Sequence, residues 1–245
     1  MTERLRVDPA LVRAEGAVAL PREAAHHLRV ARVPWGTRLV LFDGEGFECD
    51  ATLDSGGATA TLLDAPRAGV GADGAKVTWV QGYPKGDKLD TIVRQATELG
   101  VAAIWPVFTA RSVPQERGDR LAARLDRWNR IAEEAARQSG RADVPALRAP
   151  CPLDEALDAL PAGGVRLVAW EAASGSLARA VQPGCDGPVA VVAGPEGGLD
   201  AAEVDRCAAR GFVAVSLGPR ILRAETVAPA MLAALSVLRG DLRPR

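Results

Sequence analysis

The chain has 245 residues, of which 48% are hydrophobic and 25% charged, and its formal net charge is -1. This composition is typical of a globular protein with one large domain or two unequal ones. A near-neutral chain is not a uniformly basic nucleic-acid binder, so any RNA contact must come from a local patch.

No apolar run reaches the length of a membrane-spanning helix, and the N-terminus lacks the apolar core of a signal peptide. The four cysteines are far apart and form no C-x-x-C pair, which indicates neither a zinc site nor a disulfide framework. His26 and His27, the only histidines, are adjacent and have no third ligand. We therefore expect a protein of the cytoplasm without a metal.

Residues 1–70 are expected to form a small β-barrel with one helix. Short apolar runs broken by glycine-containing turns predict strands at Arg38–Phe42, Phe47–Leu53 and Thr59–Leu63. The segment Arg22–Val33 predicts the helix. A stretch rich in glycine and alanine, Arg67–Ala75, is the expected linker to a second domain over residues 76–245.

In residues 76–245 strands and helices alternate, which predicts an α/β fold with a parallel sheet covered by helices on both faces. The expected strands are Val77–Gln81, Val101–Phe108, Val165–Trp170, Val189–Ala193 and Phe212–Leu217. The expected helices run from a cap at Asp87 to Gly100, over Asp119–Ser139, Leu153–Leu160 and Leu177–Val181, from a capping box of Asp200 and Glu203 to Gly211, and onward from a cap at Thr226 with Pro229 in the first turn.

Two loops follow the last two strands, at the edge of the sheet where α/β proteins bind ligands. The first loop reads GPEGG over residues 194–198, and the second, residues 218–225, packs two apolar and three charged side chains into a turn. Neither loop matches a phosphate-binding or dinucleotide fingerprint. A ligand without a polyphosphate is expected, such as a neutral adenosine with a short zwitterionic tail. Alternatively, the glycines only make turns.

The GPEGG block followed by LGxRILRxET strongly resembles the bacterial 16S ribosomal RNA uridine-N3 methyltransferases of the SPOUT superfamily. The matching positions are Gly194, Pro195, Glu196, Gly197, Gly198, Leu217, Gly218, Arg220, Ile221, Leu222, Arg223, Glu225 and Thr226. The resemblance implies a knotted (trefoil) α/β domain with a parallel sheet, which binds S-adenosylmethionine. It also implies an N-terminal PUA-like β-barrel that binds RNA. The implied activity is methylation of N3 of a uridine in 16S ribosomal RNA, in the small ribosomal subunit.

On this basis the expected cofactor residues are Trp170, Glu171, Gly194, Pro195, Glu196, Gly197, Gly198, Leu217, Gly218, Ile221, Leu222, Arg223 and Thr226. Arg223 and Glu225 are predicted to be catalytic, because an arginine can stabilise the uracil anion and a carboxylate can take its proton. Alternatively, Glu225 belongs to an ion pair that only shapes the loop. Glu196 could bind the methionine amino group or brace the turn.

A basic stripe on the long helix is a candidate RNA contact. Arg120, Arg124 and Arg127 share one face, and residues 111–148 contain nine arginines and six acidic residues. Such a stripe suits an RNA backbone, but a solvated face with arginine–glutamate pairs has the same pattern. With the resemblance, the predicted RNA contacts are His27, Arg29, Lys85, Lys88, Arg111, Arg120, Arg124, Arg127, Glu134, Gln138 and Arg141.

A 2′-O-ribose methyltransferase of the same superfamily and a non-catalytic RNA-binding assembly protein remain alternatives, whereas an oxidoreductase would need the dinucleotide fingerprint. A homodimer is expected because the superfamily pairs through its knotted domains. The last helix, from Val227 to Leu238, is apolar or small on nearly every side, which fits burial against a second copy or within the monomer.

Overall fold

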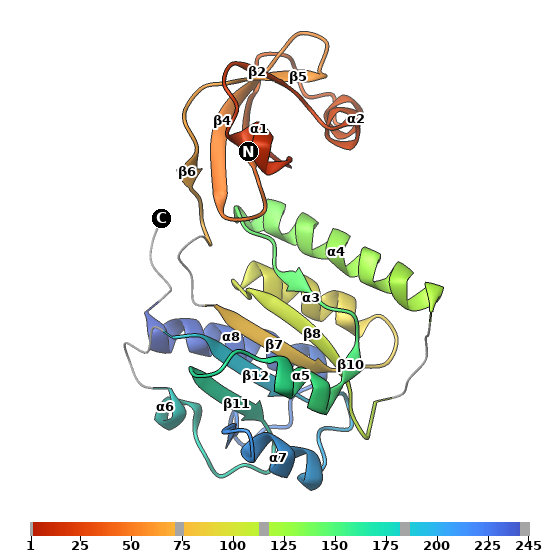
Figure 1. Cartoon of the computed structure of the whole chain (residues 1–245), viewed down its shortest axis with the longest axis vertical. Helices are drawn as coiled ribbons and strands as arrows, with labels where there is room; N and C mark the ends of the chain where they lie inside the picture. Colours follow the sequence, from red (N-terminus) through yellow and green to blue (C-terminus); the bar gives the residue numbers. More distant parts are fainter. Residues whose placement is uncertain (1, 72–75, 113–117, 182–186, 241–245) are drawn as a thin grey trace. The chain divides into compact units, whose positions relative to one another are not determined.

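The computed structural model describes residues 2–71, 76–112, 118–181 and 187–240 (Figure 1). The chain divides into two compact units. The first unit comprises Met1–Asp73 and Glu133–Val144, and the second comprises Gly74–Ala132 and Pro145–Arg245. The prediction from the sequence placed residues 133–144 in the second domain, whereas the structure groups them with the first unit.

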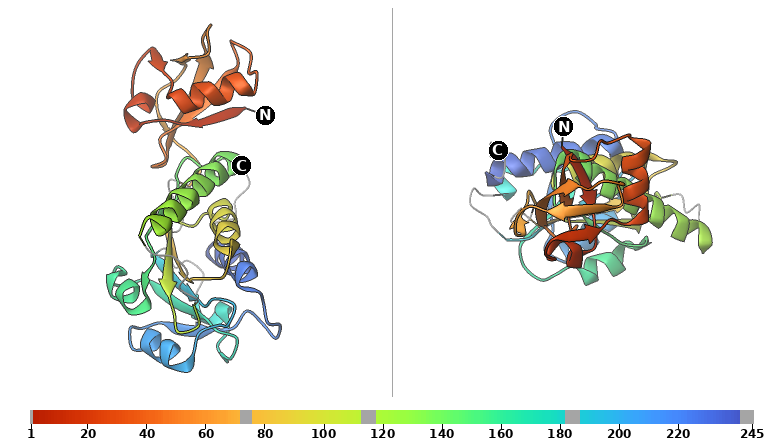
Figure 2. Two further views of the ribbon diagram at one scale, coloured as in Figure 1. Left: turned by 90° about the vertical axis from the view of Figure 1, so that its right-hand side faces the viewer. Right: turned by 90° about the horizontal axis from the view of Figure 1, so that it is seen from above.

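The first unit is built on a six-stranded mixed sheet (Figure 2). Its strands are β1 (Glu3–Arg6), β2 (Ala17–Ala19), β3 (Arg38–Phe42), β4 (Phe47–Leu53), β5 (Thr59–Leu62) and β6 (Arg67–Ala68), and its helices are α1 (Pro9–Val12) and α2 (Arg22–Val30). The strand order is β1-β3-β4-β5-β2, with β6 on β4, and only the β1–β3 pair is parallel. The predicted bounds of β3 and β4 are confirmed. Leu28 of α2 and Leu39, Leu41 and Ala51 of the sheet are buried in one core cluster.

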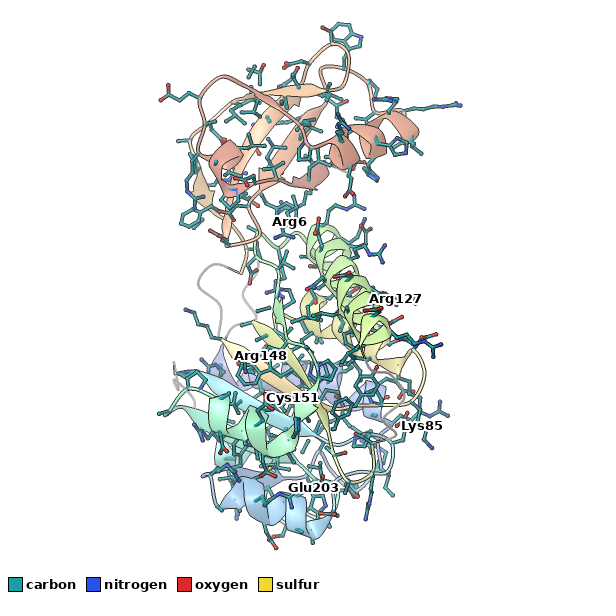
Figure 3. All side chains as sticks on the ribbon, turned by 45° about the vertical axis from the view of Figure 1, so that its right-hand side comes forward. Arg6, Lys85, Arg127, Arg148, Cys151 and Glu203 are labelled. Atoms are coloured by element: carbon teal, nitrogen blue, oxygen red, sulfur yellow. The ribbon has the colours of Figure 1, made fainter. Side chains whose placement is uncertain are left out.

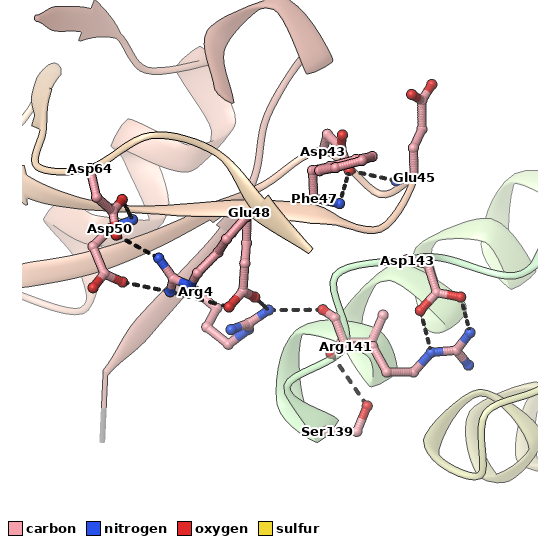
Figure 4. Close-up of polar contacts among 12 residues, drawn as sticks. Arg4, Asp43, Glu45, Phe47, Glu48, Asp50, Asp64, Ser139, Arg141 and Asp143 are labelled. Carbon is pink, nitrogen blue, oxygen red and sulfur yellow. Dashed lines mark hydrogen bonds and ion pairs between the residues drawn. The ribbon is translucent and has the colours of Figure 1, made fainter. Parts of the chain in front are cut away.

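Residues 133–144 join this unit through polar contacts near β1 and β4 (Figure 4). The guanidinium of Arg4 donates to Glu48 Oε2 over 2.7 Å and to the carbonyl oxygen of Arg141 over 3.0 Å. The side chain of Arg141 is only 4% exposed and donates two hydrogen bonds to Asp143, at 2.9 and 2.5 Å. The backbone N–H of Gly46 donates to the carbonyl of Ala142. These contacts explain why a segment far along the chain belongs with the first unit.

The second unit contains a parallel sheet, as predicted. Its strands are β7 (Val77–Gly82), β8 (Ala103–Phe108), β9 (Ala146–Leu147), β10 (Cys151–Pro152), β11 (Val165–Ala169), β12 (Val189–Ala193) and β13 (Val213–Val215). Its helices are α3 (Lys88–Glu98), the first part of α4 (Asp119–Ser139), α5 (Leu153–Ala159), α6 (Leu177–Ala180), α7 (Ala201–Ala208) and α8 (Ala224–Arg239). The strand order is β10-β8-β7-β12-β11-β13, with β9 on β8.

Successive side chains of the strands point to opposite faces of this sheet, and helices pack against them. Val80, Val168 and Val192 pack against α5 and α7, which supply Leu157 and Cys207 to the same cluster. Helices α3 and α8 pack on each other, and α8 also contacts β12 (Figure 1). The five residues of β12 are all buried, which explains its continuous apolar sequence.

Helix caps were predicted from the sequence at Asp200, Asp87 and Thr226. The capping box of α7 is confirmed, since Asp200 and Glu203 each accept the other's backbone N–H. Asp87 precedes α3 but makes no capping bond, and its carboxylate accepts a hydrogen bond from Arg124 over 2.6 Å. The predicted cap at Thr226 is wrong. Helix α8 begins at Ala224, and Pro229 therefore lies inside the helix instead of in its first turn. Among the described residues, no helix is both long and apolar enough to cross a membrane.

Candidate cofactor pocket

A cavity of about 380 Å³ lies in the second unit, at the carboxyl ends of β11, β12 and β13. Pockets of this size accommodate small organic ligands. The cavity is lined by Lys88, Ala169, Trp170, Glu171, Ala193, Gly194, Pro195, Glu196, Gly197, Gly198, Val215, Ser216, Leu217, Gly218, Arg220, Ile221, Leu222, Arg223, Ala224 and Val227. The two loops singled out by the sequence therefore face one space, joined by the residues that follow β11.

The GPEGG loop is held against the end of β7 by close backbone packing. A Cβ atom on Gly82 would lie 2.6 Å from Pro195 Cδ and 2.8 Å from its nitrogen. A Cβ atom on Gly194 would lie 2.6 Å from the carbonyl carbon of Gly198. Neither position has room for a side chain, so these two glycines fix the path of the loop.

A buried amide completes this junction. Gln81 is fully buried, and its Nε2 donates to the carbonyl oxygens of Gly194 (2.9 Å) and Gly82 (3.0 Å). Its Oε1 accepts from Trp79 Nε1 over 2.8 Å, so both ends of the amide are bonded. Gln81 is not among the site residues predicted from the sequence. The signal was available, because a polar residue at the end of an apolar strand needs partners if it is buried.

Glu196 braces the same loop from outside. Its carboxylate accepts from Lys88 Nζ over 2.8 Å and from the backbone N–H of Lys85 over 3.0 Å. Burial raises the pKa of Glu196, but the hydrogen bonds from Lys88 and from the backbone outweigh burial and hold this pKa below its usual value. Of the two roles considered for Glu196, the contacts match the brace.

The segment after β8 contacts the loop on another side. Arg111 donates to the carbonyl oxygen of Gly197. Glu203 lies on α7 (Figure 3). It is buried in the capping box of this helix and also accepts the backbone N–H of Ala110 over 2.8 Å. The cavity wall is therefore tied to α3, α7 and the end of β8, and it does not depend on glycine turns alone.

The charged side chains of the second loop, residues 218–225, form no ion pairs with one another. Arg220 and Arg223 are exposed, and neither forms an ion pair or side-chain hydrogen bond with the described residues. Glu225 follows in the first turn of α8. Its Oε2 is buried and has no hydrogen-bond partner among the described residues. The ion pair considered for Glu225 is therefore absent from the described contacts, which leaves a carboxylate oxygen and two guanidinium groups near the cavity.

All the predicted cofactor residues except Thr226 line this cavity. Their role in binding a cofactor stays a prediction. Thr226 is exposed in the first turn of α8. An adenosine with a zwitterionic tail fits these walls, which offer backbone carbonyls, the exposed carboxylate of Glu171, apolar side chains such as Leu217, and a glycine-lined path.

The predicted RNA residues are scattered, and several are already engaged. Arg124 pairs with Asp87, and Arg127 donates to Asp90 over 2.8 Å. These pairs match the alternative reading of the stripe as a solvated helix face, although Arg120 is exposed. Lys88 and Arg111 contact the GPEGG loop, as described above, and the Lys85 backbone does the same.

In the first unit, Glu134 accepts hydrogen bonds from Arg137 and Gln138. The bond from Arg137 keeps the pKa of Glu134 below its usual value, although burial opposes this shift. The RNA contact predicted for Arg141 does not fit its burial against Asp143. His27 and Arg29 remain exposed on α2. Among the described residues, no group of His, Cys, Asp and Glu is arranged to hold a metal ion.

Comparisons with known proteins agree with these features. Residues 73–238 match the family model described as an RNA methyltransferase domain. The chain is similar to ribosomal RNA small subunit methyltransferase E of Bacillus subtilis (strain 168), with 33% identity over 89% of this chain and 91% of that protein. For the enzyme of the same name from Mycobacterium tuberculosis (strain CDC 1551 / Oshkosh), the identity is 34% over 91% of this chain and 87% of that protein.

Solved structures extend the comparison to the whole fold. The crystal structure of ribosomal RNA small subunit methyltransferase E from Neisseria gonorrhoeae, bound to S-adenosyl methionine, is similar with a TM-score of 0.87 and 32% identity. The match covers 99% of this chain and all of that one. A methyltransferase from Legionella pneumophila, in complex with the bound cofactor SAM, gives a TM-score of 0.83 at 29% identity over 97% of this chain and 98% of that one.

Proposed function

Since this chain belongs to the family of ribosomal RNA small subunit methyltransferase E, we propose that it transfers a methyl group from S-adenosylmethionine to N3 of a uridine in 16S ribosomal RNA. The observation that carries this proposal is the cavity at the carboxyl ends of β11, β12 and β13, walled by the two loops that the family motifs occupy. The relative from Neisseria gonorrhoeae, whose structure holds S-adenosyl methionine, supports the choice of cofactor.

The walls of the cavity divide the binding task between backbone and side chains. The glycine path from Gly194 to Gly198 and the segment from Leu217 to Leu222 would hold the adenosine through backbone groups and apolar contacts. Glu171, exposed on the wall, is suited to a hydroxyl or an ammonium group. Glu196 acts indirectly, because its bonds to Lys88 and Lys85 fix the loop.

S-adenosylmethionine supplies a methyl group on a positively charged sulfur, and displacement from that sulfur requires the donor and acceptor to be held in line. Uracil N3 becomes a good nucleophile only after it loses its proton. Arg223, which lines the cavity, would stabilise the negative charge that develops on the uracil oxygens. Glu225, in the first turn of α8 and with an oxygen that no described residue bonds, would accept the N3 proton.

The finer expectations for the fold and assembly form part of the proposal. A trefoil knot is supported by the path of the chain, which leaves β13 at one edge of the sheet and returns to α8, packed on α3 and β12. A PUA-like barrel is supported by the small mixed sheet and the helix α2 of the first unit. A homodimer that acts on the small ribosomal subunit, in the cytoplasm, completes the proposal.

The test is methyl transfer to 16S ribosomal RNA with isotope-labelled S-adenosylmethionine, followed by mass spectrometry of the nucleosides. The expected product is a uridine methylated on N3, and transfer should survive EDTA. A methyl group on the ribose would instead identify a 2′-O-methyltransferase, and RNA binding without transfer would identify an assembly protein. Arg223→Lys and Glu225→Gln should each lower kcat by about 100-fold or more while cofactor affinity changes little.

A further inference from the structure

An exposed tryptophan follows helix α2 in the first unit. The side chain of Trp35 is 78% exposed, the next-to-largest exposure among the large apolar residues described. Its turn is anchored, because Gly36 N–H donates to the carbonyl of Leu53 over 2.7 Å and Thr37 N–H donates to that of Pro34 over 3.2 Å. The ring of Trp35 is therefore exposed to solvent on a turn that is fixed by backbone hydrogen bonds. Such a ring usually gains its stabilisation from a partner.

The face of α2 before this turn carries a basic stripe. Arg22, His26 and Arg29 have i, i+4, i+7 spacing and are all exposed, whereas Ala25 and Leu28 are buried on the other side. None of the three side chains forms a hydrogen bond or ion pair with the residues that the structure describes. This distinguishes the stripe from the one on α4, where Arg124 and Arg127 are paired.

A fourth basic residue occupies a strained position at the end of α2. Arg32 has φ of 53°, and it is the one residue other than glycine with positive φ in the described parts of the chain. Its N–H donates to the carbonyl of Arg29 and the next N–H, of Val33, donates to that of Leu28, which is the hydrogen-bond pattern of a glycine-terminated helix. An arginine there costs backbone energy that glycine would not. A strained residue other than glycine motivates a functional hypothesis for its side chain.

These residues form one surface, which we call the α2 basic surface: Arg22, His26, Arg29, Arg32 and Trp35. Arg32 and Trp35 are three residues apart, so their Cα atoms are separated by at most roughly 11 Å. Between Pro21 and Phe42 the chain has four arginines and a single acidic residue, Glu23. The segment that carries the surface therefore has an excess of positive charge.

We infer that the α2 basic surface binds a single-stranded segment of RNA, with Trp35 stacked on an unpaired base and Arg22, Arg29 and Arg32 on the flanking phosphates. Sequence-tolerant binding of single strands uses this combination of aromatic stacking and cationic contacts. The inference rests on the proposed function for the identity of the ligand as RNA. It adds residues distinct from the cofactor pocket and from the stripe on α4.

RNA fits this surface better than a protein does. A run of unpaired cations needs a partner with regularly spaced negative charge, and a phosphate backbone provides that charge along its whole length. A ring that stacks on any base also needs no shaped pocket on the partner. A protein ligand remains one outcome of the experiment below.

The experiment measures binding of the full chain to protein-free, fluorescently labelled fragments of 16S ribosomal RNA by anisotropy over a range of salt concentrations. Trp35→Ala should weaken binding roughly 10-fold, and Trp35→Phe should retain most of the affinity because phenylalanine still stacks. Val30→Ala, which removes a neighbouring exposed apolar side chain, is the matched control and should bind as the wild type does. Arg29→Ala should reduce the slope of log K against log salt by about 0.7.

Arg32→Gly separates a binding role from a structural one. Glycine relieves the positive φ, so the melting temperature should stay the same or rise while RNA affinity falls. If Trp35→Ala and Arg32→Gly both bound RNA as tightly as the wild type does, the inference would be overturned. The proposed function would stand if methyl transfer continued. A loss seen only with assembled subunits would assign the surface to a protein and also overturn it. No binding of the wild-type protein to protein-free RNA would overturn this inference, whereas the proposed function would fall only if methyl transfer to the small ribosomal subunit were also absent.

Discussion

The Nε2 atom of Gln81 donates a hydrogen bond to the carbonyl oxygen of Gly194 over 2.9 Å, which joins the end of β7 to the first residue after β12. These two strands are neighbours in the sheet, and Val192 and Ala193 pair with Val80 and Gln81. The bond therefore continues the register of the sheet into the GPEGG loop by means of a side chain. The shape of one cavity wall depends on an amide that does not line the cavity.

We expect Gln81→Leu to lower both the stability of the fold and the affinity for S-adenosylmethionine. Leucine leaves the Trp79 indole N–H and the Gly194 carbonyl without their partner, at a cost of about 1–3 kcal/mol in the free energy of unfolding. Urea denaturation and calorimetric titration measure the two effects. Gln95→Leu is the control, because Gln95 Oε1 is buried without a partner and its loss should cost little. Equal stability of the two variants would contradict the assigned role.

Gly194→Ala should reduce cofactor affinity by at least about 10-fold. The added Cβ would lie 2.6 Å from the carbonyl carbon of Gly198 and 2.8 Å from the nitrogen of Leu199, so the backbone of the loop must move. Gly187→Ala is the matched control, since the nearest atom to its Cβ lies at 3.8 Å. Calorimetry with S-adenosylmethionine compares the two variants. Wild-type affinity in Gly194→Ala would show that the loop does not shape the binding site.

The bond between Glu196 and Lys88 predicts a dependence of stability on pH. The pKa of Glu196 in the folded protein lies below the usual value of 4.5. The ionised carboxylate therefore contributes stability above pH 4.5, and the contribution is lost as the pH falls through the lowered pKa. Since the Glu196 side chain is 26% exposed, we expect an effect of no more than about 1 kcal/mol.

The measurement for Glu196 is the difference in unfolding free energy between wild type and Glu196→Gln. The difference should be present at neutral pH and should vanish in acid. A difference that grows as the pH falls would have the wrong sign for this mechanism.

The stripe on α4 can be tested by reversing Arg120 and Arg124 to glutamate. If the stripe contacts RNA, affinity should fall and the slope of log K against log salt should decrease by roughly one unit for each lost phosphate contact. Arg124 is paired with Asp87, so Arg120→Glu alone is the cleaner variant. Cofactor affinity serves as the control and should change little. An unaltered salt slope would leave the stripe as a solvated helix face.

Dimer formation predicts a specific effect of charge on α8. Val237 is 65% exposed on this helix, and the opposite face of α8 buries Met231, Leu232 and Leu235. Val237→Glu should give a monomer that has lost methyl transfer, as measured by sedimentation, while the fold survives. Val213→Glu, an exposed apolar position on β13, is the control and should remain dimeric. A fully active wild-type monomer would rule out the dimer proposal.

Much of the fold followed from periodicity and caps, and its failures have local causes. The bounds of β3, β4, β12 and α4 were predicted correctly, because each is a continuous run with clear ends. The short elements β1, α1 and β2 were not predicted, since three or four residues carry no period. The start of α8 was placed too late because Thr226 is a good cap, but helix formation begins after Arg223 without any side-chain cap.

For the site, sequence motifs located the loops but not the contacts that fix them. Motifs brought together the residues around the cavity, whereas Gln81 and Gly82 lie on a strand more than 100 residues away in the chain, and only the sheet register brings them to the loop. The charges on α4 could not be classed as free or paired from sequence, because their partners Asp87 and Asp90 lie at the start of α3, far from α4 in the chain.

The inclusion of residues 133–144 in the first unit limits how this protein can be divided. A gene fragment that stops at residue 71 would encode β1 to β6 but would lack Glu133, which pairs with Arg6 over 2.9 Å, and the Arg141 carbonyl that receives the Arg4 guanidinium. The complementary fragment would retain this segment without the sheet that it contacts. Gene truncation at the linker should therefore yield unstable pieces, and recombination between relatives should preserve both segments as a linked pair.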